Sequence, residues 1–363
     1  MTRIYLIRHA EAEGNLYRIA QGQANSNLTD RGWKQVQALE RRFRDIPVDA
    51  VYASDLYRTC ATASAVYLPK GLVLHRNPRL REICVGAWEH RSWGEIQRRW
   101  PEEMGHFSQR PDLWQVEGAE TPREARDRVL AAIREIAAEN EGKTVAVFSH
   151  GYVLRMILSQ LQGIPLEELG KTPTGSNTAV SLLEAEGGTL RVVFRDDDSH
   201  LRELEELTGE RLTRQASGLE TGLWFAPLRL PEEAEEFVAL AAAGWWGEAS
   251  FDRERLLESA AGRETLLGYL NQDPVGLLQV DPQTGWISLL CVRPDCRLRG
   301  FGVQLLGQAV QQVRAAGGER VLAPWIRDPE IERFFHSYGF HPSADGRTQE
   351  KEIGFDPAFL GKV

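Results

Sequence analysis

The chain has 363 residues, of which 42% are hydrophobic and 26% are charged. This composition is typical of a globular protein and excludes a disordered or fibrous chain. At about 100–200 residues per domain, the length predicts two domains. The formal net charge of −9 argues against an extended nucleic-acid or anionic-membrane surface, so an anion site must be a local group of Arg, His and backbone amides.

The cysteines and the apolar segments indicate the cellular compartment that we expect for the protein. Four scattered cysteines are too few for a disulfide framework and are typical of buried thiols in a reducing compartment. The chain opens with a short apolar run that ends at Arg8-His9, which predicts a strand and not a signal peptide. No apolar run approaches about 18 residues, so we expect no membrane span and a cytoplasmic location.

Strands alternate with helices through residues 1–200, which predicts an α/β domain with a largely parallel sheet and a mixed edge. Hydrophobic periodicity supports the helices, since Val129, Ile133 and Ile136 fall on one stripe of the longest of them. In chain order, the predicted elements are strand Ile4–Ile7, helix Thr29–Arg44, strand Ala50–Ala53, helix Arg58–Tyr67, helix Pro122–Glu139, strand Thr144–Ser149, a helix from about Val153, and strands Val180–Glu184 and Leu190–Phe194.

A charged segment with weak apolar periodicity follows. We interpret residues 201–222 as a solvated linker with a short helix at Leu201–Leu207. Beyond it, strands come first and helices later, which favours an α+β domain over residues 223–363. Its predicted elements are strand Leu223–Leu230, helix Pro231–Ala242, strands Leu266–Leu270, Val275–Val280 and Trp286–Val292, helix Phe301–Ala316, strand Arg320–Trp325 and helix Glu330–Tyr338.

Basic and imidazole side chains stand just after three strands of the first half. Arg8 and His9 end the first strand, and Arg58 follows the second. His150 directly follows the strand that ends at Ser149. Because ligands bind at the carboxyl ends of strands in an open α/β sheet, we expect these side chains to converge at one rim. Arginine and imidazole groups match the charge and the acceptor oxygens of a phosphoryl group.

Phosphoryl chemistry at such a rim needs a nucleophile and an acid. A neutral imidazole held by a backbone carbonyl can attack phosphorus and form a phosphohistidine that water later hydrolyses. The departing alkoxide needs a proton, and Glu82 is our candidate for the carboxyl that supplies it.

Tryptophans gather between Glu82 and His150. We interpret them as part of a helical cap packed on the sheet; the alternative is that one lines an apolar or aromatic substrate pocket. They are Trp88, Trp93, Trp100 and Trp114.

The first half carries short motifs in a definite order. They are Arg8-His9-Ala10-Glu11, Asn15, Gln21-Gly22, Leu28-Thr29-Asp30-Arg31-Gly32, Ser54-Asp55-Leu56-Tyr57-Arg58 and Ser149-His150-Gly151. As a set, they make residues 1 to about 200 similar to the histidine phosphatase superfamily, in the branch that contains phosphoglycerate mutases and small-molecule phosphatases.

This resemblance implies a phosphoglycerate mutase-like three-layer α/β fold, with His9 as the nucleophile and Glu82 as the proton donor. No metal or organic cofactor is implied, and the sequence shows no metal-ligand spacing. Ala10 replaces the family's glycine, so its methyl group is expected to crowd the pocket or to change the backbone angles. The implied phosphate pocket contains Arg8, Asn15, Gln21, Gly22, Arg58, His150 and Gly151.

Mutases and phosphatases share this machinery. The span from Glu82 to His150 is short compared with the corresponding segment of the mutases, and it leaves less chain for a lid that would exclude water. We therefore favour a phosphatase, with a phosphoglycerate-type mutase as the alternative.

A second anion site is predicted where a strand of the second half meets a helix. Gly300 and Gly302 let the backbone curl so that successive N–H groups point outward, and the following helix N-terminus adds its dipole. Such a cradle suits a pyrophosphate.

The motif Arg297-x-x-Gly300-x-Gly302 and the run Phe334-Phe335 to Gly339-Phe340 resemble those of the GNAT acetyltransferases, over about residues 223–345. The resemblance implies acetyl-CoA as cosubstrate and a primary amine as acceptor. Phe335 stands where the family usually has the tyrosine that protonates the CoA thiolate. The residues implied to bind acetyl-CoA are Val292, Arg297, Leu298, Arg299, Gly300, Phe301 and Gly302.

The sequence thus predicts a bifunctional enzyme with a phosphatase domain over 1–200, a linker over 201–222 and a GNAT-like domain over 223–363. Its expected partners are a small phosphorylated metabolite and a small amine. The alternative from another class is a module that senses CoA or phosphate ligands, with one or both halves inactive; Ala10 and Phe335 are the departures that favour it.

Overall fold

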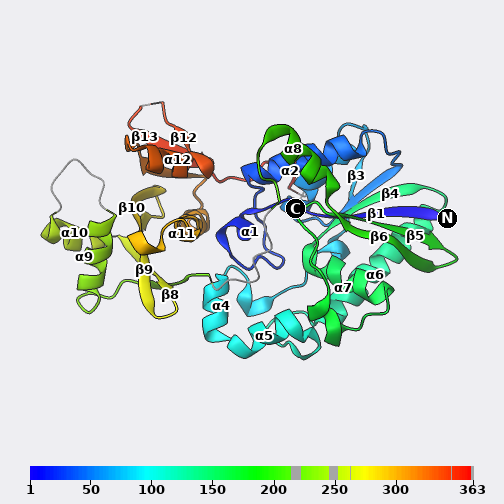
Figure 1. The fold of residues 1–363 in the computed structure, drawn as a ribbon, viewed down its shortest axis with the longest axis horizontal. Helices are drawn as coiled ribbons and strands as arrows, with labels where there is room; N and C mark the ends of the chain where they lie inside the picture. The colour runs from blue at the N-terminus through cyan, green and yellow to red at the C-terminus, as the bar shows by residue number, and fades with distance from the viewer. Residues whose placement is uncertain (214–221, 245–251, 262, 345, 361–363) are drawn as a thin grey trace.

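The computed structural model describes residues 1–213, 222–244, 252–261, 263–344 and 346–360. These residues form two lobes, each built on one sheet (Figure 1). The N-terminal lobe, blue to green in the figure, carries a six-stranded sheet, and the C-terminal lobe, yellow-green to red, a seven-stranded one. Within the described ranges, no helix is both long and apolar enough to cross a membrane.

The sheet of the N-terminal lobe is parallel at its centre and antiparallel at one edge. Strand β1 pairs in parallel with β4, and β2 in parallel with β4 and β3. Strand β5 runs antiparallel to β1 and to β6, so the predicted mixed edge is confirmed. The order is β3-β2-β4-β1-β5-β6, with β1 at Thr2–Arg8, β2 at Ala50–Ala53, β3 at Leu74–Arg76, β4 at Thr144–Ser149, β5 at Val180–Glu186 and β6 at Thr189–Asp197.

Helices cover both faces of this sheet, which gives the three layers expected from the sequence. One hydrophobic cluster joins the sheet to α6 and α7 through Ile133 and Ile157, and another joins it to α2 and α3 through Leu39 and Ala61. The helices of this lobe are α1 at Glu13–Tyr17, α2 at Asp30–Phe43, α3 at Tyr57–Tyr67, α4 at Trp93–Arg99, α5 at Pro101–Gln109, α6 at Pro122–Glu139, α7 at Gly151–Leu161 and α8 at Ser199–Thr208.

Several short elements were not predicted from the sequence. Helix α1 has five residues, too few for a hydrophobic period, and β3 has three.

Helices α4 and α5 form the cap expected for the tryptophan-rich segment, and the ring centroids of the buried Trp88 and Trp114 are 5.3 Å apart. The short helix expected in the linker is α8, whose Leu201 and Leu204 are buried in a cluster with Ala38 of α2. Residues 199–208 therefore pack on the N-terminal lobe, while positions 214–221 of the expected linker lie outside the described residues.

The C-terminal lobe has a mixed sheet in the order β12-β13-β11-β10-β9-β8-β7. Its central strands β10 and β11 are parallel but pair at Trp286–Leu322 alone, so they diverge beyond that point. Helix α10 and strands β12 and β13 were not predicted. The strands are β7 at Trp224–Pro227, β8 at Glu264–Leu270, β9 at Asp273–Asp281, β10 at Trp286–Val292, β11 at Arg320–Pro324, β12 at His341–Pro342 and β13 at Thr348–Glu352, and the helices are α9 at Ala234–Ala243, α10 at Arg253–Ala261, α11 at Phe301–Ala315 and α12 at Pro329–Ser337.

The two lobes meet where α1 packs against α11, as Figure 1 shows. Tyr17 of α1 is buried in the same hydrophobic cluster as the core of the C-terminal lobe. The carboxylate of Glu13 accepts two hydrogen bonds from Arg314, at 2.9 and 3.1 Å. After the last strand, the chain returns to the N-terminal lobe, where Phe355 and Phe359 pack on the ring of Tyr57. The lobes are therefore joined by apolar packing and by the ion pair of Glu13 with Arg314.

Gly307 of α11 lies against α1 so closely that a side chain does not fit. A Cβ at this position would be 2.5 Å from the Cβ and Cγ of Tyr17. We expect Gly307→Ala to lower the free energy of unfolding by about 1–2 kcal/mol, because overpacking outweighs the helix propensity gained. Thermal and chemical denaturation measure the change.

The matched control is Gly105→Ala in α5, where an added Cβ meets no described atom within 4 Å. This variant gains helix propensity alone, so it should raise the free energy of unfolding. Stabilisation of the same size by both substitutions would contradict the packing described for α1 and α11.

Candidate active site

A cavity of about 560 Å³ opens at the carboxyl ends of β1 and β4. The parallel register pairs Arg8 with Ser149, so the residues that follow the two strands lie side by side. His150 is fully buried behind the cavity, and its ring centroid is 5.3 Å from that of His9. The structure thus brings together the residues expected at the first site. Those in the cavity wall are Arg8, His9, Asn15, Gln21, Gly22, Arg58, Glu82 and Gly151.

His9 is held as a neutral imidazole with one nitrogen free to react. Its Nδ1 lies 2.7 Å from the carbonyl oxygen of Ala10, and because a carbonyl only accepts, Nδ1 carries the proton. The other nitrogen, Nε2, then keeps its lone pair. Burial lowers the pKa of His9 well below 6.5, and the positive charges of Arg58 and Arg8 lower it further.

Arg58 stands under the cavity with its guanidinium fully buried. Its two terminal nitrogens donate to the carbonyls of Ala24 and Gly22, at 2.7 and 2.8 Å. Burial lowers its pKa to about 10, so it remains charged at neutral pH. Among the described residues, the Nε atoms of Arg58 and of Arg8 have no hydrogen-bond partner. Buried donors of this kind match the acceptor oxygens of an anion.

His150 precedes α7 and is buried behind the wall of the cavity, next to His9. Its Nε2 lies 2.9 Å from the hydroxyl of Ser54, while its Nδ1 is buried without a partner among the described atoms. Burial lowers the pKa of His150 well below 6.5, with the charge of Arg58 as the next cause. The glycine that follows is required, because a Cβ on Gly151 would lie 2.8 Å from the Nε of Arg8.

Glu82 enters the cavity from the loop after β3, and its carboxylate rests on the first turn of α7. The carboxylate accepts the backbone N–H groups of Tyr152 at 3.0 Å and Val153 at 3.1 Å. It also accepts the N–H of Ile83 at 3.1 Å. These three bonds fix the orientation of the carboxyl group in the cavity that His9 lines.

The crowding expected from Ala10 is not observed. Ala10 is fully buried in the hydrophobic cluster between the sheet, α2 and α3, so its methyl group packs in the core and is not part of the cavity wall. Its backbone N–H donates to the hydroxyl of Thr62 at 2.9 Å. A larger residue than glycine is therefore accommodated without narrowing the site.

Several wall residues were missed from the sequence. Ser176 and Asn177 precede β5, and because β5 is antiparallel, its amino end lies at the same rim as the carboxyl ends of β1 and β4. The signal that could have found them is the polar Thr174-Gly175-Ser176-Asn177 run before a buried strand. Trp93 also lines the cavity, so one tryptophan of the cap reaches the site. That a tryptophan lines an apolar or aromatic substrate pocket stays a prediction. The remaining wall residues with functional groups are Arg18, Gln35, Ser108, Gln109, Tyr152, Arg155, Thr174 and Thr213.

The residues of the second expected site lie between β10 and α11. Gly300 is the N-cap of α11 and has a φ of 78°, and Gly302 sits where a Cβ would lie 2.9 Å from the ring of Phe334. Gly300 offers no side chain to cap the helix, so, among the described residues, no side-chain cap occupies the first N–H groups of α11, which could bind an anion. Val292, Arg297, Leu298, Arg299 and Phe301 flank this turn, and the Nη2 of Arg297 donates to the carbonyl of Ala243 at 2.9 Å.

Phe335 and Tyr338 of the C-terminal lobe have different surroundings. Phe335 is 3% exposed and packs against Phe334 and Phe340, so it is a core residue. Tyr338 lies at the end of α12, in a crevice that Asp30 of the N-terminal lobe also lines. Tyr338 therefore faces the other lobe and does not substitute for a tyrosine at position 335.

A family model for the histidine phosphatase superfamily (branch 1) matches residues 4–198, more than half of the chain. The chain belongs to the histidine phosphatase superfamily. A model for an acetyltransferase (GNAT) domain matches residues 233–357 of the C-terminal half. Both resemblances inferred from the sequence are thereby confirmed.

Relatives of the histidine phosphatase domain include both activities weighed from the sequence. Phosphoserine phosphatase 1 of Hydrogenobacter thermophilus is 29% identical over 168 residues, which are 46% of this chain and 80% of that protein. The probable phosphoglycerate mutase GpmB of Salmonella choleraesuis is 32% identical over 168 residues, 46% of this chain and 77% of that protein.

Solved structures match the same domain. Bacillus stearothermophilus YhfR has a TM-score of 0.54 and 33% identity, and the match covers 55% of this chain and 99% of that one. A mycobacterial glucosyl-3-phosphoglycerate phosphatase shares the fold, with a TM-score of 0.51 and 21% identity over 54% of this chain and 99% of that one.

The protonation of His9 can be measured directly. Because burial and two arginines disfavour the imidazolium, the pKa of His9 lies well below 6.5 and its ring should stay neutral at pH 6.5. In ¹H–¹⁵N spectra of the histidine-labelled protein, the ring signals that disappear in His9→Gln should show no titration around pH 6.5. A midpoint at or above this pH would contradict the electrostatics described.

Proposed function

We propose that the histidine phosphatase domain hydrolyses small phosphate monoesters through a phosphohistidine on His9. In the first step, the Nε2 of His9 attacks phosphorus, the ester P–O bond breaks, and Glu82 protonates the departing oxygen. In the second step, water attacks the phosphohistidine, Glu82 takes the proton of the water, and the P–N bond breaks to release phosphate. The observation that carries this proposal is the neutral imidazole between two arginines in one cavity.

The charges around His9 support this chemistry. The transferred group spreads negative charge over its peripheral oxygens, which preorganised donors stabilise in a site shielded from water. Arg8 and Arg58 each present a buried Nε without a partner among the described residues, and His150 presents its Nδ1. We assign these three side chains, with Asn15, Gln21, Gly22 and Gly151 around them, to the phosphoryl pocket.

The covalent step predicts an acid-labile phosphoryl group on the enzyme. When the wild-type protein is quenched with base during turnover of a ³²P-labelled phosphate ester, label should remain on the protein and be lost in acid. His9→Ala should abolish both the label and the release of phosphate, since no other group takes the nucleophilic role. The matched control is His75→Ala, which removes an exposed histidine of β3.

The same experiment separates a phosphatase from a mutase. With 3-phosphoglycerate as substrate, free phosphate supports the proposed hydrolysis, and 2-phosphoglycerate without phosphate release supports the mutase, the activity named for one relative. If His9→Ala kept both the label and the release of phosphate, neither the phosphatase nor the mutase activity could depend on His9, and both proposals would be overturned.

We infer that the GNAT domain binds acetyl-CoA at the amino end of α11 and transfers its acetyl group to a small amine. Bound acetyl-CoA supplies the activated acetyl group. The backbone N–H groups of residues 300–302 would hold the pyrophosphate, with Val292, Arg297, Leu298 and Arg299 along the turn. Among the described residues, β10 and β11 pair only at Trp286–Leu322, so the later residues of β10, which lead to this turn, have no partner in β11. Because Phe335 has no acidic proton, either water or another group must protonate the departing thiolate.

Gly300→Val should weaken CoA binding at least about tenfold, because a residue with a φ of 78° is strained when it carries a branched side chain. Isothermal titration with CoA measures the change. The matched control is Gly317→Val, a glycine with a φ of 85° at the other end of α11, which should bind CoA like the wild type. Equal losses in both variants would exclude the cradle as the binding site.

The sensing alternative for this domain is tested with the same protein. Release of thiol from acetyl-CoA in the presence of a panel of primary amines supports acetyl transfer. Tight CoA binding without thiol release for any amine of the panel would overturn acetyl transfer and favour a CoA sensor.

A further inference from the structure

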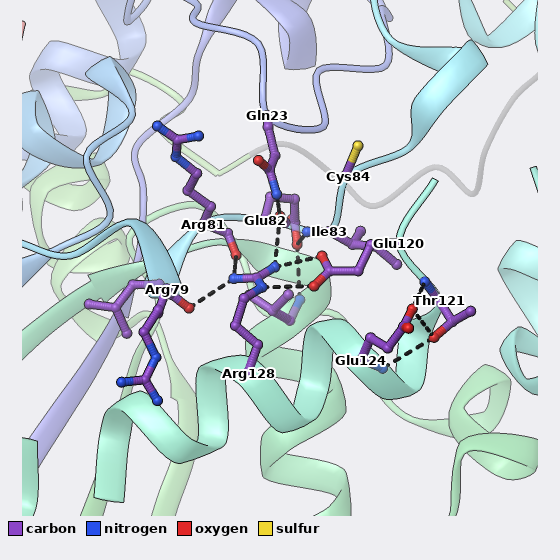
Figure 2. Close-up of polar contacts among 12 residues, drawn as sticks. Gln23, Arg79, Arg81, Glu82, Ile83, Cys84, Glu120, Thr121, Glu124 and Arg128 are labelled. Atoms are coloured by element: carbon purple, nitrogen blue, oxygen red, sulfur yellow. Dashed lines mark hydrogen bonds and ion pairs between the residues drawn. The ribbon is translucent and has the colours of Figure 1, made fainter. Parts of the chain in front are cut away.

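Arg128 of α6 binds the main chain of the segment that carries Glu82. Figure 2 shows its guanidinium among the carbonyl groups of this segment. Nη1 donates to the carbonyl oxygens of Arg79 at 2.8 Å and Arg81 at 3.1 Å, and Nη2 donates to that of Glu82 at 3.3 Å. One side chain therefore binds three carbonyl groups within four consecutive residues.

The guanidinium is itself held in place by Glu120. The two carboxylate oxygens of Glu120 accept Nε and Nη2 of Arg128, both at 2.7 Å, and the ion pair is about one-fifth exposed. With the three carbonyls, these bonds use all five N–H donors of the arginine. The backbone N–H of Glu120 donates to the carbonyl of Cys84 at 3.0 Å, just beyond Glu82. The pair thus binds the chain on both sides of Glu82.

Residues 81–85 form no helix or strand, so their carbonyl groups depend on donors from elsewhere. The carbonyl of Glu82 also accepts the side-chain amide of Gln23 at 3.0 Å. The carboxylate of Glu82 rests on the N–H groups at the start of α7. Glu82 is therefore fixed at its main chain by α6 and at its carboxyl group by α7.

We propose that Arg128 is a positioning residue that fixes the carboxyl group of Glu82 for proton transfer to the departing oxygen. This rests on the proposed function, in which Glu82 is the acid. A general acid must lie within hydrogen-bond reach of the oxygen that it protonates, so a displacement of its main chain impairs this step more than the attack by His9. Glu120 acts with Arg128, since it fixes the plane of the guanidinium.

The proposal is tested by comparing two phosphate esters. The departing alkoxide of glycerol 2-phosphate requires a proton, whereas the phenolate of 2,4-dinitrophenyl phosphate leaves without one. The measured quantity is kcat/KM for each ester, which reports the steps up to the phosphohistidine. The ratio of the two kcat/KM values isolates the contribution of the general acid. A general structural defect lowers both values together and leaves the ratio unchanged.

Loss of the acid sets the scale of the effect. Glu82→Gln should lower the ratio of the alkyl to the aryl value by about 10²–10⁴-fold, the usual contribution of general acid catalysis. Arg128→Met, which frees the three carbonyls, should lower the same ratio at least about tenfold, because the acid is present but displaced. Arg128→Lys should also lower it, since an ammonium group cannot bind Glu120 in two places and the carbonyls as well.

Two further variants make the test decisive. Arg134→Met removes an exposed arginine of the same helix and should leave the ratio unchanged. Glu120→Gln is the milder disruption, to be used if Arg128→Met does not fold, and turnover of the dinitrophenyl ester reports whether the site is intact. Equal losses on both esters in the Arg128 and Glu120 variants, or no loss at all, would overturn the positioning role.

The outcomes also separate this inference from the proposed function. If Glu82→Gln lowers the ratio and the Arg128 variants do not, the positioning role is wrong and Glu82 remains the acid. If Glu82→Gln leaves the ratio unchanged, the acid role of Glu82 is wrong and the inference is overturned with it.

Discussion

The parallel pairing of β1 with β4 is the constraint on which the first site depends. Its register sets Arg8 opposite Ser149. The residues that follow the two strands, His9 and His150, are therefore buried side by side. The two imidazoles lie with their ring centroids 5.3 Å apart, beside two arginines and away from water. In these surroundings they cannot readily take up protons. The same burial that destabilises the charged form leaves His9 with one unprotonated ring nitrogen. The protonation state of the two histidines thus follows from where the sheet places them.

Both lobes use the amino end of a helix, but in opposite ways. At α7, the first N–H groups are occupied by the carboxylate of Glu82, a group of the protein itself. At α11, the N-cap is Gly300, and no side chain in the described part of the chain caps the helix. The positive end of a helix dipole stabilises negative charge in either case. In the histidine phosphatase domain these donors orient the carboxylate of Glu82, and in the GNAT domain they would hold a ligand.

Helix α1 links the two lobes physically. Asn15 lines the cavity that contains His9, while Tyr17, half a turn away, packs against Gly307 of α11. The ion pair of Glu13 with Arg314 lies on the same contact. One wall of the phosphoryl cavity is therefore also part of the interface with the GNAT domain.

The sequence by itself determined the two families, the order of the main strands and helices, and the residues that follow β1, β2 and β4. It could do so because strand and helix periods, and motifs such as Ser149-His150-Gly151, are written in neighbouring residues. The tertiary structure alone decided what depends on residues far apart in the chain. It brought Asn177 to the rim through the antiparallel β5, directed the methyl group of Ala10 into the core, and packed the five-residue α1 on α11. It also placed Arg128 behind Glu82, because a side chain that binds carbonyl groups some 47 residues away leaves no pattern in the local sequence.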